Sequence, residues 1–310
     1  MIVKICALLL LSYFIRPASA QTPQNILLFP ADTVYGNYLA IPPKSDTIKG
    51  VLVLFPGYCQ RVESIFPETK LHIEAYNNHL LTIAFAPGSK LYVDSVTTVR
   101  LDALFKDVMK RWKVKPENFV LSGFSAGGLV AMRYTEMCNE HPELRPIKPT
   151  GVFTIDSPID LFTLWDFFKE TIAANFSEPA VSEAKNAMNI VNREYGNPEN
   201  NIKLFSSMTP FCMNKAWGDN EKYLKNTAVR VYHDIDVVWR LVNRHQTVHN
   251  SNYEVTSELI CRLMLLGNTR AEFIQSAKKG YRSNGMRHPH SWSIVDEREC
   301  IQWVLKLFGA

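Results

Sequence analysis

The chain has 310 residues, of which 46% are hydrophobic and 21% are charged, and this composition is typical of a globular protein rather than a disordered one. The formal net charge is +4 and no block of basic residues occurs, which argues against nucleic acid as the main partner. The cysteines beyond residue 20 include no CxxC pair, so they predict no metal site and no unique disulfide pairing.

The first 20 residues resemble a secretory signal peptide. Lys4 precedes an apolar run over residues 5–15, and Ala18-Ser19-Ala20 supplies the small residues of a cleavage site. The run is shorter than the roughly 20 residues needed to span a bilayer, and no later run reaches that length. The sequence therefore predicts a secreted or periplasmic protein, mature from residue 21 to 310, without an integral membrane segment after signal cleavage.

Short apolar runs alternate with longer amphipathic stretches along the rest of the chain. The runs lie at residues 51–55, 80–85, 119–121, 151–155, 228–232 and, more weakly, 271–274. Continuous apolar runs are typical of strands that are covered on both faces, as in a parallel sheet. Helical spacing of apolar residues occurs between them, for example at 101–112 and 301–308. The alternation predicts an α/β fold, to which residues 35–41 add antiparallel edge strands.

One interval breaks this alternation. The apolar runs that end at Ile155 and begin at Ala228 are separated by about 70 residues, far more than the 10 to 15 of a crossover helix. The interval is rich in aromatic residues, Trp165 among them. We interpret residues 156–226 as a helical cap inserted into a single domain that spans residues 21–310. The alternative is an ordinary pair of packed helices with long loops.

The clearest chemical signal is Gly123-Phe124-Ser125-Ala126-Gly127, a G-x-S-x-G motif between an apolar run and a helical pattern. Glycine on both sides lets a serine occupy a sharp, strained turn, because larger side chains would collide with the strand and the helix. The next amide lies at a helix N-terminus, where the dipole favours negative charge. We predict that Ser125 is a nucleophile; the alternative is a spectator serine.

On these residues the chain resembles the α/β-hydrolase superfamily, from about Ile48 to the C-terminus. The resemblance implies a mostly parallel sheet of about eight strands flanked by helices, with Ser125 above the strand ends. It also implies the chain order nucleophile, acid, histidine. It names no substrate, because the superfamily includes esterases, lipases, peptidases and thioesterases.

A serine hydroxyl needs a base, and in the superfamily the histidine lies between the last strand and the C-terminal helix. His288 and His290 fit that place. We favour His290, since it is followed by Ser291-Trp292 in a pattern common there, whereas His288 precedes a proline that biases it to extended backbone. If neither is the base, His233 is the next candidate.

A carboxylate must orient this histidine. Asp236 follows the apolar run 228–232 by a few residues, where the superfamily acid usually lies, and is our prediction. Asp234 is an alternative on the same loop. Asp156 and Asp160 are further alternatives, because some members carry the acid one strand earlier.

Acyl transfer also needs two amides directed at the developing oxyanion. We predict the backbone amide of Ala126 and, from the loop after the run 51–55, that of Tyr58. Gly57 and Cys59 are the alternatives for the second amide. The Pro56-Gly57 sequence departs from the His-Gly start that is frequent in the superfamily.

The sequence therefore predicts an exported serine hydrolase that cleaves a small-molecule or polymer-borne carboxylic ester through an acyl-enzyme on Ser125. No cofactor is expected. His245 and His249 have i,i+4 spacing but lack the glutamate of HExxH, so we expect no metal site. The alternatives are a serine peptidase of the same fold and a catalytically silent binding protein.

Overall fold

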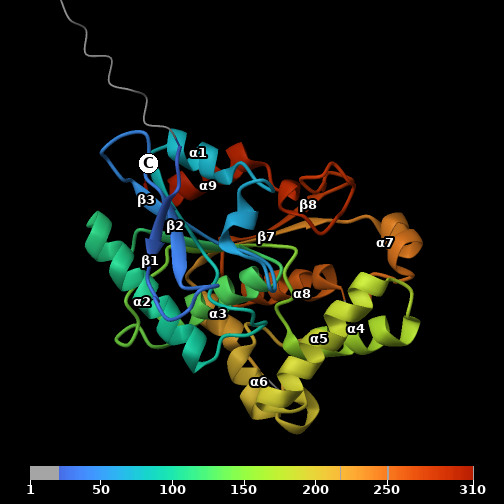
Figure 1. Ribbon diagram of the computed structural model, residues 1–310. Helices are drawn as coiled ribbons and strands as arrows, with labels where there is room; N and C mark the ends of the chain where they lie inside the picture. Colours follow the sequence, from blue (N-terminus) through green and yellow to red (C-terminus); the bar gives the residue numbers. More distant parts are fainter. Residues whose placement is uncertain (1–20, 217, 250, 310) are drawn as a thin grey trace, which may run out of the picture.

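A computed structural model describes residues 21–309 except 217 and 250, so the predicted signal peptide lies outside the described residues. Eight strands form one sheet in the order β1-β2-β4-β3-β5-β6-β7-β8 (Figure 1). Strands β3 to β8 pair in parallel, and β1 and β2 form an antiparallel edge. The strands are β1 (Gln24–Leu27), β2 (Asn37–Ile41), β3 (Gly50–Phe55), β4 (Leu80–Phe85), β5 (Phe119–Phe124), β6 (Gly151–Ile155), β7 (Ala228–Asp234) and β8 (Ala271–Ser276).

Helices cover both faces of the sheet. Helices α1 and α9 lie on one face, and α2, α3 and α8 lie on the other (Figure 1). The covering helices are α1 (Leu71–Asn77), α2 (Ser95–Trp112), α3 (Ala126–Glu140), α8 (Asn252–Leu265) and α9 (Glu297–Leu307). Every residue of β3 to β7 is buried. This burial explains why most of these strands appear in the sequence as continuous apolar runs. The predicted mostly parallel α/β sheet is confirmed.

The interval between β6 and β7 is helical. It contains α4 (Leu161–Ala174), α5 (Glu178–Tyr195) and α6 (Ile202–Met208), together with the short 3-10 segments Pro198–Asn200 and Asn220–Leu224. Asp160 begins α4, because its carboxylate accepts the amide protons of Phe162 and Thr163. Asn175 ends α4 in the left-handed conformation, with φ 45°. Trp165 is 5% exposed and packs in the core on the α3 side of the sheet.

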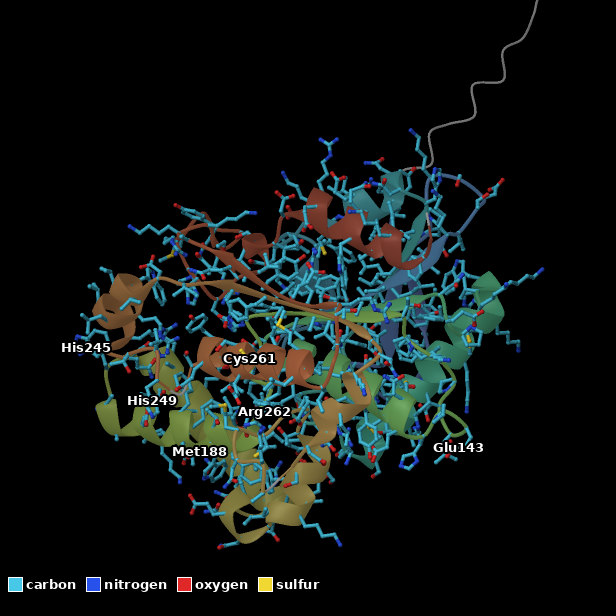
Figure 2. The ribbon with its side chains drawn as sticks, turned by 180° about the vertical axis from the view of Figure 1, so that it is seen from behind. Glu143, Met188, His245, His249, Cys261 and Arg262 are labelled. Carbon is cyan, nitrogen blue, oxygen red and sulfur yellow. The ribbon has the colours of Figure 1, made fainter. Side chains whose placement is uncertain are left out.

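A short helix after β7, α7 (Val237–Arg244), lies against the α4–α5 corner. His245 ends α7 and stacks on Phe176, with 3.5 Å between ring centroids, while the Gln246 side chain donates to the Thr171 hydroxyl. Figure 2 shows His245 at the end of α7, on the same side of the molecule as Met188 of α5. Through these contacts α7 packs against the helices between β6 and β7.

The five cysteines from Cys59 onward are all free, and Cys138, Cys212 and Cys300 are buried. Within the described residues, no helix combines the length and apolar character that crossing a bilayer would require.

Candidate active site

Ser125 lies on a strained turn between β5 and α3. Its backbone has φ 54° and ψ −126°, a conformation that costs a non-glycine residue about 1–3 kcal/mol. A side chain at Gly127 would place its Cβ 2.3 Å from the Phe55 carbonyl oxygen, and one at Gly123 would lie 2.1 Å from the Gly127 carbonyl carbon. The two glycines are therefore a steric requirement of the turn that presents Ser125.

Two cavities meet at Ser125. The first, here called the cap-side cavity, has a volume of about 190 Å³ and is lined by Ser125, His290 and residues of α4, α5 and α7. The second, the loop-side cavity, has about 390 Å³ and lies against residues 57–60 of the loop after β3. Ser125, His290 and Tyr58 line both cavities, so the predicted nucleophile and base share one site.

His290 is held by a carboxylate and by an aromatic surface. Its Nδ1 lies 2.7 Å from Oδ2 of Asp156, and its ring packs on Phe124 with centroids 4.4 Å apart. Trp292, 1% exposed, packs against the same phenylalanine. If Nδ1 carries the proton that Asp156 accepts, Nε2 has a free lone pair in the site that contains Ser125. This arrangement suits a general base.

Asp156 directly follows β6, and both oxygens of its carboxylate contact other side chains. His290 contacts Oδ2, while His233 Nδ1 lies 3.2 Å from Oδ1 and the Asn252 side-chain amide donates to Oδ1 at 3.2 Å. The Asn252 amide also donates to the Asp156 backbone carbonyl at 2.9 Å. Burial opposes ionisation, but His290 and His233 outweigh it and hold the pKa of this carboxyl well below its usual range. The carboxylate is therefore ionised and fixed in orientation.

The structure does not bring Asp236 to His290. Its carboxylate caps α7 by accepting the Trp239 amide proton at 2.9 Å, and it pairs with Arg287 at 2.9 Å. Asp234 accepts from the Gly280 amide and pairs with the same arginine, each at 2.8 Å. The physical reason is that the chain enters α7 directly after β7, and both carboxylates pair with Arg287. The histidine partner is instead Asp156, one of the alternatives one strand earlier.

The remaining alternatives are engaged elsewhere. Asp160 caps α4 and accepts the Met213 amide proton at 2.8 Å. His233 is 2% exposed, and its Nε2 lies 2.6 Å from the Thr256 hydroxyl, so it supports Asp156 from the side away from His290. The sequence offered no local pattern for His233 or Asn252, because neither forms a motif with Asp156 along the chain.

His288 differs from His290 in its surroundings. Its ring packs against Trp239 with centroids 4.6 Å apart, and its Nε2 lies 3.2 Å from Nη2 of Arg244. Burial, reinforced by the nearby charges of His290, Arg282 and Arg244, lowers the pKa of His288 to about 3. His288 is therefore neutral at ordinary pH, and it has no contact with Asp156 of the kind that His290 makes.

The two predicted oxyanion amides come from different segments: Ala126 directly follows Ser125, and Tyr58 lies in the loop after β3. The Ala126 amide begins α3, where the helix dipole favours negative charge. In the loop after β3, the Gly57 amide donates to the Gln60 side chain at 2.8 Å, so it is already engaged. Cys59 has φ 55°, and Tyr58 lines both cavities. The Tyr58 amide stays the prediction for the second position.

No metal centre is visible in the part of the chain that the structure describes, where no three His, Cys, Asp or Glu side chains gather to hold an ion. His249 lies 3.5 Å from Glu254, while His245 stacks on Phe176.

No protein-family model and no curated protein matches the chain. Among solved structures, MPT51 of Mycobacterium tuberculosis matches with a TM-score of 0.57 at 12% identity, over 94% of this chain and 99% of that one. Carboxyl esterase 2 of the mycorrhizal fungus Tuber melanosporum gives 0.56 at 14% identity, over 96% and 89%. The fluorophosphonate-binding serine hydrolase F of Staphylococcus aureus gives 0.53 at 12% identity, over 91% and 98%.

At these identities the matches establish a likeness of fold alone. The chain therefore has the α/β-hydrolase fold, as the resemblance of its sequence implied, and esterases and serine hydrolases are among its structural neighbours.

Proposed function

We propose that this protein is a serine hydrolase that cleaves a carboxylic ester through an acyl-enzyme on Ser125. The observation that carries the proposal is the 2.7 Å contact of His290 with Asp156, beside a serine on a strained strand–helix turn. Carboxyl esterase 2 among the structural neighbours supports an ester as the substrate class. The residues 1–20 that resemble a signal peptide support export to the periplasm or the medium.

In the proposed reaction, Nε2 of His290 removes the hydroxyl proton of Ser125 while Oγ attacks the ester carbonyl carbon. Asp156 fixes the tautomer of the ring and stabilises the imidazolium that forms. The amides of Ala126 and Tyr58 donate to the oxyanion. His290 then protonates the leaving alcohol, and it later deprotonates the water that hydrolyses the acyl-enzyme and restores Ser125. The cycle needs no cofactor.

A fluorophosphonate probe tests the nucleophile, because it reacts with an activated serine. The mature protein should be labelled, and Ser125→Ala and His290→Ala should abolish labelling and hydrolysis of 4-nitrophenyl acetate while leaving the circular dichroism spectrum unchanged. An unlabelled wild-type protein without esterase activity would indicate a silent binding protein. Parallel assays on aminoacyl 4-nitroanilides separate an esterase from a peptidase.

Two isosteric variants test the acid. Asp156→Asn should lower kcat by about 10⁴, because an amide cannot hold the required tautomer of His290. Asp236→Asn is the matched control; it should keep most of the activity, because asparagine still caps α7 and only the ion pair with Arg287 is lost. If Asp156→Asn stayed active and Asp236→Asn lost its activity, Asp236 would be the acid.

A further inference from the structure

Three arginines that line the site have no carboxylate partner. Within residues 21–309, leaving aside 217 and 250, no ion pair joins Arg240, Arg244 or Arg282 to a carboxylate, and the side-chain hydrogen bonds of Arg240 and Arg244 go to neutral groups. Elsewhere each arginine with a largely buried side chain pairs with a carboxylate: Arg100 with Asp32, Arg133 with Glu136, Arg145 with Asp102, Arg230 with Glu299, Arg262 with Glu258 and Arg287 with Asp234. Among such arginines of the described residues, the three without an ion pair are thus the ones that line the two cavities.

Arg240 is the most confined of the three. It lies on α7, and its side chain lines the cap-side cavity together with Ser125 and His290. Its Nε donates to the Thr247 carbonyl at 2.9 Å, whereas its Nη2 is buried and has no hydrogen-bond partner. Burial also lowers the pKa of this guanidinium. A desolvated cation without a counter-ion is costly, so an anion in the cavity would be bound favourably.

Arg244 lies one helical turn later on the same face of α7, as i,i+4 spacing requires. Its Nη1 donates to the Ser177 hydroxyl at 2.6 Å, and its Nη2 lies 3.2 Å from Nε2 of the neutral His288. Arg244 also lines the cap-side cavity. Two guanidinium groups are thus fixed side by side along one wall, in positions set by contacts to neutral partners.

The acidic groups at this cavity form no ion pair with Arg240 or Arg244 in the described part of the chain. Asp156 is engaged by two histidines, and Asp234 and Asp236 share Arg287. Glu183 of α5 also lines the cavity, and its charge acts on Arg244 and Arg282 from a distance; its side chain is exposed, and no ion pair links it to an arginine in the described part of the chain. The loop-side cavity adds the charge of Arg282, which stands over the Phe124 ring at 5.2 Å. Arg240, Arg244 and Arg282 are therefore cations at the site that no ion pair joins to a carboxylate in the described part of the chain.

We propose that Arg240 and Arg244 bind an anionic group of the substrate, so that the preferred substrate is an ester that also carries a carboxylate. A planar guanidinium matches a carboxylate in a two-point hydrogen bond, which provides orientation as well as affinity. The inference rests on the proposed ester hydrolysis and specifies its substrate class. The carboxylate binds along α7 while the ester carbonyl lies at Ser125.

Matched ester pairs test the inference and tell which side of the ester carries the charge. In the first pair, mono-4-nitrophenyl glutarate has a carboxylate at the end of its acyl chain where 4-nitrophenyl pentanoate has a methyl group. In the second pair, 3-acetoxybenzoate has a carboxylate on its phenol ring, and phenyl acetate has none. In one pair, kcat/KM for the acidic ester should exceed that for the neutral ester by about tenfold or more. Arg240→Gln should lower that ratio by about tenfold, since a charged hydrogen bond is lost.

Two further variants serve as controls. Arg298→Gln removes the same charge from an exposed site on α9 and should leave the ratio unchanged. Arg240→Lys keeps the charge without the two-point geometry and should retain part of the preference. Preference for the neutral ester in both pairs would overturn the inference. An equal loss on both members of a pair in Arg240→Gln would also overturn it, because Arg240 would then act through Asp156 or through the fold.

A binding measurement keeps this result separate from the proposed hydrolysis. Glutarate and 3-hydroxybenzoate, the acidic products of the two test esters, can be titrated calorimetrically into Ser125→Ala. One of them should bind, and adding Arg240→Gln should weaken its binding by about tenfold. Binding without hydrolysis by the wild-type protein would refute the esterase and retain the anion site. Hydrolysis without binding of either product, and without preference for an acidic ester, would refute the anion site alone.

Discussion

Asp156 shows how one residue gains its role from long-range contacts. Each oxygen of its carboxylate contacts a histidine ring. Nδ1 of His290 lies 2.7 Å from Oδ2, and Nδ1 of His233 lies 3.2 Å from Oδ1. Its own backbone has φ 42°, which turns the side chain away from the continuation of β6. Because both oxygens are occupied, small changes in the surrounding loops leave its orientation fixed. This is the property required of the residue that aligns a catalytic base.

His288 provides a prediction on pH at the same scale. Its pKa is about 3 in the folded protein and near 6.5 in an unfolded chain, so the unfolded state binds more protons between these values. Stability contributed by the neutral ring is therefore present above pH 6.5 and is lost as the pH falls toward 3. His288→Asn should reduce the drop in melting temperature between pH 7 and pH 4.5. Equal drops in variant and wild type would show that His288 is not kept neutral by the fold.

The strand–turn–helix of β5 and α3 is the element that presents the nucleophile. Its geometry depends on the close approach of Gly127 to the backbone of β3, where a Cβ would lie 2.3 Å from the Phe55 oxygen and 2.4 Å from the Pro56 oxygen. Backbone atoms cannot move aside as a flexible side chain can. The element therefore tolerates no side chain at this position without displacing either the helix or the loop that contains Tyr58.

Gly127→Ala should accordingly destabilise the protein by about 3 kcal/mol, the upper end of the range for overpacking, and should slow fluorophosphonate labelling of Ser125. Gly218→Ala is the control, because a Cβ there would make an ordinary contact at 3.4 Å. Chemical denaturation and labelling rates measure the two effects. A Gly127→Ala protein with unchanged stability and labelling would mean that the turn is less tightly packed than these distances require.

At the scale of the whole molecule, the sheet separates two hydrophobic cores, and the helices between β6 and β7 extend one of them. The core on the α3 side continues into α4, α5 and α6, whereas the core on the other face is closed by α1 and α9. The cap-side cavity lies where the extended core meets α7 and the ends of the parallel strands. In open α/β sheets this carboxyl edge is the usual place for a binding site.

Two aromatic residues of α4 differ in their surroundings, so their variants can distinguish a structural role from a contact with the substrate. Trp165 is 5% exposed within the core, whereas Phe167 lines the cap-side cavity. Trp165→Ala should cost about 3–5 kcal/mol without changing the ranking of acyl esters by kcat/KM. Phe167→Ala should change that ranking with a smaller loss of stability. A changed ranking in Trp165→Ala and an unchanged one in Phe167→Ala would invert this assignment.

The sequence by itself determined the local features. Buried strands appear as apolar runs, and the turn at Ser125 needs glycine at Gly123 and Gly127, so both follow from neighbours along the chain. Even so, β5 extends beyond the predicted run 119–121 through Ser122 and Gly123, because burial between neighbouring strands overrides their weak strand propensity.

The tertiary structure alone decided which aspartate meets His290. Asp156, Asp234 and Asp236 all lie at or just after the end of a strand, and the position of the loop before α9 cannot be read from the sequence that ranks them. That loop brings Arg287 to Asp234 and Asp236, and it brings His290 to Asp156 across 134 positions of chain. The lack of an ion pair at Arg240 within the described residues has the same origin. Charge pairing depends on contacts between segments distant in sequence, and no local pattern encodes them.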